Sequence, residues 1–177
     1  MYRYSMTQWV MGDEELEKSF QRLKDCGYDA IEFAADPYGL DAQRCLALMR
    51  KYGLDAISMC GMFGAADRDL TQKDGASAIR YLCDSVDFAR SLGAGIIIVV
   101  PAEVGRTAPP AGEEFDDLWS NAVRNIRSAA DYAQKNGVRF VIEAINRYET
   151  YFVNTLAKAW KLVQENGCPS AKPAAAE

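Results

Sequence analysis

The sequence contains no histidine in its 177 residues. Without histidine the chain cannot build a Ser-His-Asp triad or a histidine-ligated zinc site, and it lacks the commonest general base of enzymes. Its five cysteines show no C-x-x-C or other ligand spacing, so we interpret them as core or surface thiols. Three familiar chemistries are thus excluded, and a cysteine metal site is not indicated.

Basic residues are in deficit, because 20 Lys and Arg stand against 25 Asp and Glu for a formal net charge of −5. A chain without a basic face is a poor partner for nucleic acid. Runs of 18 or more apolar residues are also missing, and residues 1–5 lack the apolar region of a signal peptide. We therefore expect no nucleic-acid partner, no membrane partner and a cytoplasmic location.

Glycine marks a repeat along the chain. Five amphipathic helical segments run into a glycine, and four of these glycines (Gly27, Gly53, Gly93 and Gly137) lead into a short apolar segment. A glycine after a helix, followed by an apolar strand, is typical of a βα repeat. The fifth glycine, Gly167, is followed only by a short segment that we interpret as a polar tail.

The repeat predicts five βα units joined as a parallel sheet with right-handed crossovers. The expected strands are about 3–6, 30–34, 56–59, 95–100 and 139–142, and the expected helices about 14–25, 42–51, 76–91, 113–135 and 156–165. The apolar run 95–100 is typical of a parallel strand that is buried on both faces.

An open doubly wound sheet and part of a (β/α)8 barrel both fit this order of elements. The first strand is not followed by a Gly-rich phosphate turn, and the P-loop pattern is absent, so the barrel is favoured. We predict an α/β fold, a partial TIM barrel with strands in the order 1-2-3-4-5. Residues 1–168 would form one domain, and residues 169–177 a disordered polar tail.

Glu143 is the main candidate for a functional residue. It closes the apolar segment 140–142, and a carboxylate in such a place is costly unless it is paired, hydrogen-bonded or bound to a cation. Function is one reading of this position. An ion pair with Arg147 or Arg139 at the barrel rim is an equally weighted alternative.

Polar residues also lie near the ends of the other predicted strands, where a barrel carries its function. We interpret the acids of the segment 67–69 as solvated residues that cap the following helix. The loop with Glu103 and Arg106 is either a lid or a mobile connection. Glu32 is either the partner of a functional group or part of a rim ion pair, and Trp9 either walls a sugar pocket or packs above the first strand.

The segment 143–149, Glu-Ala-Ile-Asn-Arg-Tyr-Glu, resembles the sugar isomerase/epimerase superfamily with the xylose-isomerase-like barrel. It is most similar to ketose 3-epimerases of the tagatose/psicose type, which carry a Glu-x-x-Asn-Arg-x-Glu segment after strand five. The segments 30–35, 69–71 and 89–94 fit the same pattern. The resemblance covers about residues 2–170.

The resemblance implies a TIM-barrel enzyme that moves a carbon-bound proton of a ketose through an enediolate. A divalent metal (Mn, Co or Mg), held by acidic and histidine ligands, would assist this step. By position Glu143 would be both a catalytic residue and a metal ligand. Glu149 would bind the sugar near its terminal hydroxyl, and Glu32 is also placed among the expected sugar-binding residues.

The departures from the family pattern are as informative as the matches. The remaining family ligands, an Asp, a His and a second Glu, come from strands six to eight, and this chain has no histidine. We infer a C-terminally truncated barrel, inactive or nearly so alone, whose open sheet edges favour a homo-oligomer. The alternatives are a non-catalytic, self-associating α/β fragment and a lyase of the same barrel superfamily.

Overall fold

The computed structural model describes residues 2–168 and 171–173, which form one parallel sheet with a helix after each of its first five strands. The six strands lie in chain order, and every neighbouring pair is parallel. They are β1 (Ser5–Thr7), β2 (Ala30–Ala35), β3 (Asp55–Gly61), β4 (Ile96–Val99), β5 (Arg139–Ile142) and β6 (Ala171–Pro173).

Helices fill the connections, as the βα repeat predicts. They are α1 (Leu16–Asp25), α2 (Ala42–Tyr52), α3 (Ala76–Leu92), α4 (Phe115–Lys135) and α5 (Leu156–Asn166), with two 3-10 turns, η1 (Gln8–Met11) and η2 (Ala66–Arg68). Gly53 and Gly93 end α2 and α3 in the left-handed region, with φ of 64° and 80°, which a residue with a Cβ rarely adopts.

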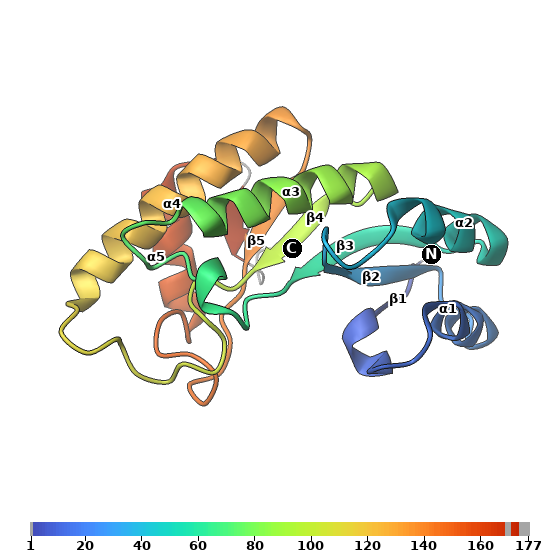
Figure 1. The fold of residues 1–177 in the computed structure, drawn as a ribbon, viewed down its shortest axis with the longest axis horizontal. Coiled ribbons are helices and arrows are strands. Elements are labelled where there is room, and N and C mark those ends of the chain that lie inside the picture. Colours follow the sequence, from blue (N-terminus) through green and yellow to red (C-terminus); the bar gives the residue numbers. More distant parts are fainter. Residues whose placement is uncertain (1, 169–170, 174–177) are drawn as a thin grey trace.

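Consecutive helices pack against one another, α1 on α2 and so on to α5. Figure 1 shows α3 and α4 lying along one face of the curved sheet. This is the arrangement of a partial (β/α)8 barrel, so the predicted fold class and the order of the first five strands are confirmed. Among the described residues, no helix is both long and apolar enough to cross a membrane.

A sixth strand was not predicted, and the expectation that no strand follows residue 168 is wrong. Ala171 pairs with Phe140 of β5 and is buried. Alanine, lysine and proline carry little strand propensity, so the segment gives no signal by itself, and the exposed edge of β5 is what makes it a strand. Pro173 is acceptable there because β6 is an edge strand. The rest of the predicted tail, residues 169–170 and 174–177, lies outside the described residues.

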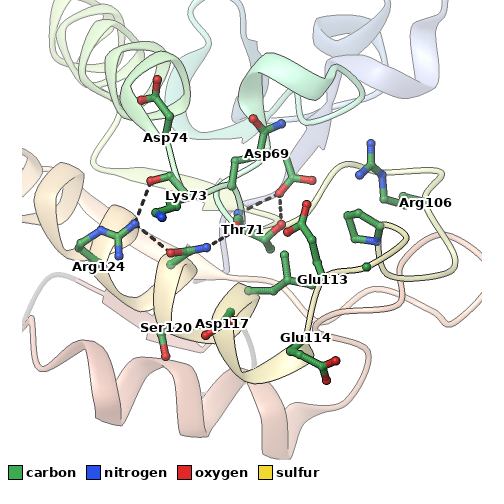
Figure 2. Close-up of a pocket in the computed structure, with 15 residues that line it drawn as sticks. Asp69, Thr71, Lys73, Asp74, Arg106, Glu113, Glu114, Asp117, Ser120 and Arg124 are labelled. Atoms are coloured by element: carbon green, nitrogen blue, oxygen red, sulfur yellow. Dashed lines mark hydrogen bonds between the residues drawn. The ribbon is translucent and has the colours of Figure 1, made fainter.

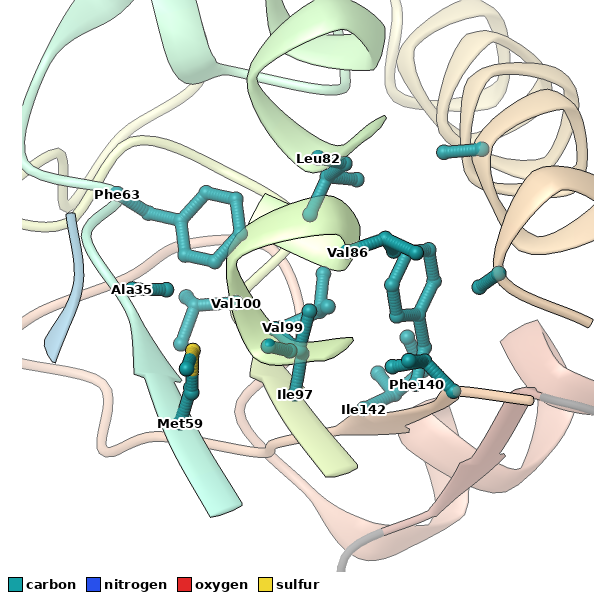
Figure 3. Close-up of a cluster of buried hydrophobic side chains, with 14 of the residues drawn as sticks. Ala35, Met59, Phe63, Leu82, Val86, Ile97, Val99, Val100, Phe140 and Ile142 are labelled. Atoms are coloured by element: carbon teal, nitrogen blue, oxygen red, sulfur yellow. The ribbon is translucent and has the colours of Figure 1, made fainter. Parts of the chain in front are cut away.

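The side of the sheet that faces the helices holds the apolar core. Met59, Ile97, Val99, Phe140 and Ile142 are almost completely buried there. Figure 3 shows them beneath side chains of α3. Each such side chain stabilises the fold by roughly 1.5–3 kcal/mol relative to an exposed position.

The other side of the sheet, which we call the inner face, carries the residues between these core positions. Ile96 and Ile98 on β4 are half-buried there, while Ile97 and Val99 are buried. The expectation that β4 is buried on both faces is therefore wrong. The cause is that the sheet does not close on itself in the described residues, so strands do not cover its inner face from the opposite side.

Candidate active site

Three polar side chains meet on the inner face where β2 and β3 run side by side. Ser58 of β3 donates a hydrogen bond from its hydroxyl to Oε2 of Glu32 on β2, with an O–O distance of 2.6 Å. The ladder between the two strands shifts register between Ile31 and Phe33, so Glu32 sits at an irregularity in the sheet. The third side chain, Cys60, follows Ser58 by two residues and shares its face.

Thr7 belongs to the same region, because it pairs with Glu32 across the β1–β2 ladder. Its hydroxyl oxygen is buried and has no hydrogen-bond partner within the part of the chain that the structure describes. Buried hydroxyl groups are nearly always hydrogen-bonded in folded proteins. An orphaned hydroxyl next to a half-buried carboxylate is therefore a candidate contact for a ligand.

Glu143 lies just past β5, and its backbone continues the strand ladder. Its N–H donates to the carbonyl of Val99 at 3.0 Å. Alternation along the strand puts its side chain on the same face as Val141, the inner face. Burial raises the pKa of the Glu143 carboxyl above its ordinary value, and the charges of Glu32 and Glu149 raise it further. The site therefore stabilises the protonated form of this acid more than water does.

The charges of Glu32 and Glu143 both act on the Cys60 thiol. Burial raises the pKa of its thiol to about 11, with contributions from Glu32 and Glu143, while a hydrogen bond with Trp9 acts in the opposite direction. The thiol is thus protonated at neutral pH, which makes it a poor nucleophile and a poor metal ligand. No pattern in the sequence indicated that Cys60 would lie within the electrostatic influence of Glu32 and Glu143.

Glu149 lies in the exposed turn that follows Glu143. The side-chain amide of Asn146 donates a hydrogen bond to its carboxylate, and the N–H of Glu149 donates to the Asn146 carbonyl at 3.0 Å. The negative charge of Glu149 raises the pKa of Glu143. The structure thus brings Glu149 into the electrostatic surroundings of Glu143, but its carboxylate already has a partner in the turn.

The loops that follow β4 and β5 are joined by backbone hydrogen bonds. The N–H of Gly105 donates to the Glu149 carbonyl at 2.8 Å, and the N–H of Tyr151 donates to the Arg106 carbonyl at 3.0 Å. Arg106 also forms an ion pair with Glu103. Because these contacts join the loop to the connection after β5, they argue against the interpretation of the loop as a separately mobile connection.

One form of the rim ion pair that competed with a functional role for Glu143 is not observed. Among the described residues, no salt bridge connects Glu143 with Arg147. Trp9 lies in η1 and is about half exposed, at 51%, so it is not a core aromatic. Asp36, which follows β2, accepts a hydrogen bond from the Gly39 N–H at 3.0 Å and serves its own turn.

The prediction for the segment 67–69 is wrong for Asp69 and for the helix cap, whereas Asp67 is exposed as expected. Asp69 is not solvated but 2% exposed, and its Oδ1 accepts hydrogen bonds from the N–H and the hydroxyl of Thr71. Helix α3 begins later, at Ala76, whose N–H is 3.2 Å from Oδ1 of Asp74. Asp69 instead accepts hydrogen bonds within its own turn, from Thr71 two residues further on.

The donor set on the inner face does not make a complete metal site. A divalent cation such as Mn, Co or Mg needs several oxygen or nitrogen donors around it. Within residues 2–168 and 171–173, no three His, Cys, Asp or Glu side chains are grouped as metal ligands. Glu143 and Glu32 offer carboxylate oxygens, and Cys60 offers only a protonated thiol. These donors alone do not fit a metal-assisted reaction step.

The fold and the inner face together define the class: a parallel βα barrel segment with a desolvated carboxyl, Glu143, just past the end of β5, where barrel enzymes carry their active sites. Comparison with known families agrees. Residues 20–174 match the family described as xylose isomerase-like TIM barrel, and the chain belongs to that family.

Curated relatives of this chain are sugar epimerases and isomerases. The L-ribulose 3-epimerase of Methylomonas sp. (strain DH-1) is 31% identical over 150 residues, which cover 82% of this chain and 51% of the relative. The ketose 3-epimerase of Arthrobacter globiformis is 28% identical over 165 residues, covering 89% and 54%. The chain thus spans about half the length of these relatives.

A solved structure gives the same picture. A D-allulose 3-epimerase from Methylomonas sp., in complex with D-allulose, superimposes with a TM-score of 0.83 at 28% identity and covers 96% of this chain and 60% of that one. Sequence and fold therefore agree on the xylose isomerase-like TIM barrel family for this chain.

Proposed function

We propose that this chain carries the sugar-binding and proton-transfer part of a ketose isomerase or epimerase site, with Glu143 as the acid–base residue. The observation that carries the proposal is the desolvated Glu143 carboxyl on the inner face, facing the charge of Glu32. A carboxylate whose pKa is raised above its ordinary value is a stronger base, and its protonated form can return the proton. The family and the names of the relatives support the class of substrate.

In the proposed reaction the Glu143 carboxylate removes a proton from the carbon next to the ketose carbonyl. The electron pair of the C–H bond moves to the carbonyl oxygen, which gives an enediolate, and Glu143 becomes the protonated acid. Glu149, Glu32 and the unpaired Thr7 hydroxyl would bind sugar hydroxyl groups. The hydrogen bond from Ser58 would hold Glu32 in place for that contact.

The first experiment tests binding of the sugar. Saturation-transfer NMR with D-allulose, L-ribulose and D-tagatose should show ketose signals that weaken in Glu143→Gln. Glu114→Gln is the matched control, because it removes the same charge outside the inner face. Equal binding by all three proteins, or no binding by the unsubstituted chain, would contradict the proposal.

The second experiment tests turnover by the chain alone. We propose that it is absent or vestigial, because the described residues hold no metal-ligand group and the sequence has no histidine. NMR in D2O, with Mn, Co or Mg added, would follow deuterium exchange at the carbon-bound position. Deuterium exchange by the unsubstituted chain that disappears in Glu143→Gln would contradict the proposal that the chain alone is inactive. The same result would support the acid–base role of Glu143.

A non-catalytic, self-associating fragment is the second candidate, and one observation favours it. The edge strand β1 is surrounded by exposed large apolar side chains, among them Tyr2, Tyr4, Trp9 and Val10 at 51–88% exposure. Open strand edges with exposed apolar side chains are sites of association. Sedimentation velocity at micromolar concentration should then show an oligomer. A monomer without ketose binding would exclude both candidates.

A further inference from the structure

A cavity of about 780 Å³ lies outside the inner face, between the loop that precedes α3 and the loop that precedes α4. Figure 2 shows that α4 closes one of its sides. Its lining includes none of the inner-face residues Thr7, Glu32, Ser58, Cys60 and Glu143. It is therefore separate from the proposed sugar site.

One lining residue, Asp69, carries a buried oxygen for which the described part of the chain supplies no hydrogen-bond donor. Asp69 is 98% buried, since its exposed fraction is 2%. Its Oδ1 accepts two hydrogen bonds from Thr71, at 2.8 and 2.6 Å. Its Oδ2 is buried and has no hydrogen-bond partner within the described residues. A buried carboxylate oxygen left in this way is costly, so a donor is expected to reach it.

The surroundings of Asp69 favour a positively charged donor. Figure 2 shows the Glu113 carboxylate next to that of Asp69. Both acids act on the same hydroxyl: burial raises the pKa of Tyr151, and the charges of Asp69 and Glu113 raise it further. No hydrogen bond or ion pair of the Glu113 side chain is found among the described residues. Two neighbouring carboxylates of which neither has a cation are a repulsive pair.

The cationic residues of the cavity do not relieve this pair. Arg106 is bound to Glu103, and Arg124 donates hydrogen bonds at 3.0 Å to the Lys73 carbonyl and to Asn121. Figure 2 places Lys73 with Arg124, on the side of the cavity away from Glu113. The lining as a whole is acidic, with three cationic residues against five acids, which are Asp69, Asp74, Glu113, Glu114 and Asp117.

A metal ion is not the ligand that this donor set selects. No three His, Cys, Asp or Glu side chains of the described chain are grouped as metal ligands. An ammonium group has three N–H donors, and it can satisfy Asp69 and Glu113 with hydrogen bonds while it neutralises their charge. We propose that this cavity binds a small organic ammonium ion, whose N–H groups reach Oδ2 of Asp69 and the carboxylate of Glu113.

The test uses butylammonium as the probe and butanol as its neutral counterpart, followed by amide chemical shifts in NMR titrations of the whole chain. Butylammonium should give saturable shifts of the residues around Asp69, Thr71 and Glu113, and butanol should not. Equal binding of both probes, or no saturable shift with butylammonium, would overturn the proposal. The proposal would also be overturned if manganese chloride gave a saturable effect on the same residues while butylammonium did not bind.

Two substitutions and one control make the test specific. Asp69→Asn keeps the acceptor for Thr71 and removes the charge, and Glu113→Gln changes an exposed residue that should not affect folding. Each should weaken butylammonium binding about tenfold or more, as expected for the loss of one charge-assisted hydrogen bond.

Glu114→Gln removes the same charge one residue away, and Figure 2 shows its carboxylate pointing away from Asp69. It should leave the affinity within about twofold, because a distant exposed charge contributes little. If Glu113→Gln and Glu114→Gln weaken binding equally, only the general acidity of the cavity matters and the proposal is wrong. If Asp69→Asn does not fold, Glu113→Gln still decides the question.

Discussion

The two faces of the sheet use alternate residues of the same strands, and they differ in what those residues do. On β4, Ile97 and Val99 are buried against the helices, while Ile96 and Ile98 are half-buried on the inner face. On β2, Phe33 packs into the core, while Glu32 on the opposite face accepts a hydrogen bond from Ser58. The helix-facing side therefore stabilises the fold, and the inner face is where ionisable groups are tolerated and can carry function.

The largest difference between the faces should appear on neighbouring residues of β4. Ile97→Ala should lower the free energy of unfolding by about 2–5 kcal/mol, because it leaves a cavity in a fully buried site. Ile98→Ala removes the same atoms from the half-buried face and should cost clearly less. Urea unfolding followed by circular dichroism measures both, and equal losses would show that the faces do not differ in packing.

A smaller effect is expected from the hydrogen bond on the inner face. Ser58→Ala removes the donor to Glu32 and should lower the free energy of unfolding by about 1–2 kcal/mol, since a partly buried carboxylate loses its partner. Chemical unfolding at neutral pH gives the value. Ser91→Ala is the matched control, because the Ser91 hydroxyl donates only to a backbone carbonyl within α3. An equal loss of unfolding free energy in both variants would show that the hydrogen bond to Glu32 stabilises the fold no more than an ordinary serine hydrogen bond does.

Glu143→Gln should act in the opposite direction and should depend on pH. The pKa of Glu143 is higher in the folded state than its ordinary value of 4.5, so the folded chain binds the proton more tightly than the unfolded chain does. Ionisation of this group therefore reduces stability as pH rises through and above that value.

At neutral pH the free energy of unfolding of Glu143→Gln should exceed that of the unsubstituted chain. The difference should shrink as pH falls below about 4, where the carboxyl is protonated in both states. Unfolding curves across this pH range measure it. A gap that widens toward low pH would mean that the folded state favours the charged form.

The smallest effect concerns reactivity and not stability. With a pKa of about 11, the Cys60 thiol is ionised in roughly one molecule in a thousand at pH 8. Alkylation by iodoacetamide, followed by peptide mass spectrometry, should label exposed Cys26 long before Cys60. Glu32→Gln should speed the labelling of Cys60, because it removes a charge that raises the pKa. Faster labelling of Cys60 than of Cys26 would contradict the described surroundings.

Much of the architecture was readable from the sequence, because helices that end at glycines such as Gly53 and Gly93 carry local signals. The position of Glu143 after an apolar strand was readable for the same reason. What the sequence could not provide depends on contacts between distant segments. The strand at Ala171 exists because of the edge of β5, and the burial of Asp69 results from packing of its loop.

The pairing of Ser58 with Glu32 depends on the register of two strands, which periodicity alone does not fix. Thr7, whose hydroxyl has no hydrogen-bond partner in the described part of the chain, is another residue that sequence patterns did not single out. A possible signal was its place at the end of the first predicted strand, where barrel folds concentrate function. The roles of Glu149 and Glu32 in binding a sugar stay predictions.

The hydrogen bonds that connect Gly105 with Glu149, and Arg106 with Tyr151, have a consequence for how such a chain can vary. Arg106 and Thr150 form an isolated parallel β-bridge, so the positions of the two connections along the chain are aligned with each other. An insertion into either connection on the amino-terminal side of that bridge would displace the other as well. Changes in length at this end of the molecule are therefore expected to occur in matched pairs, and Glu149 would shift whenever the segment around Gly105 is rebuilt.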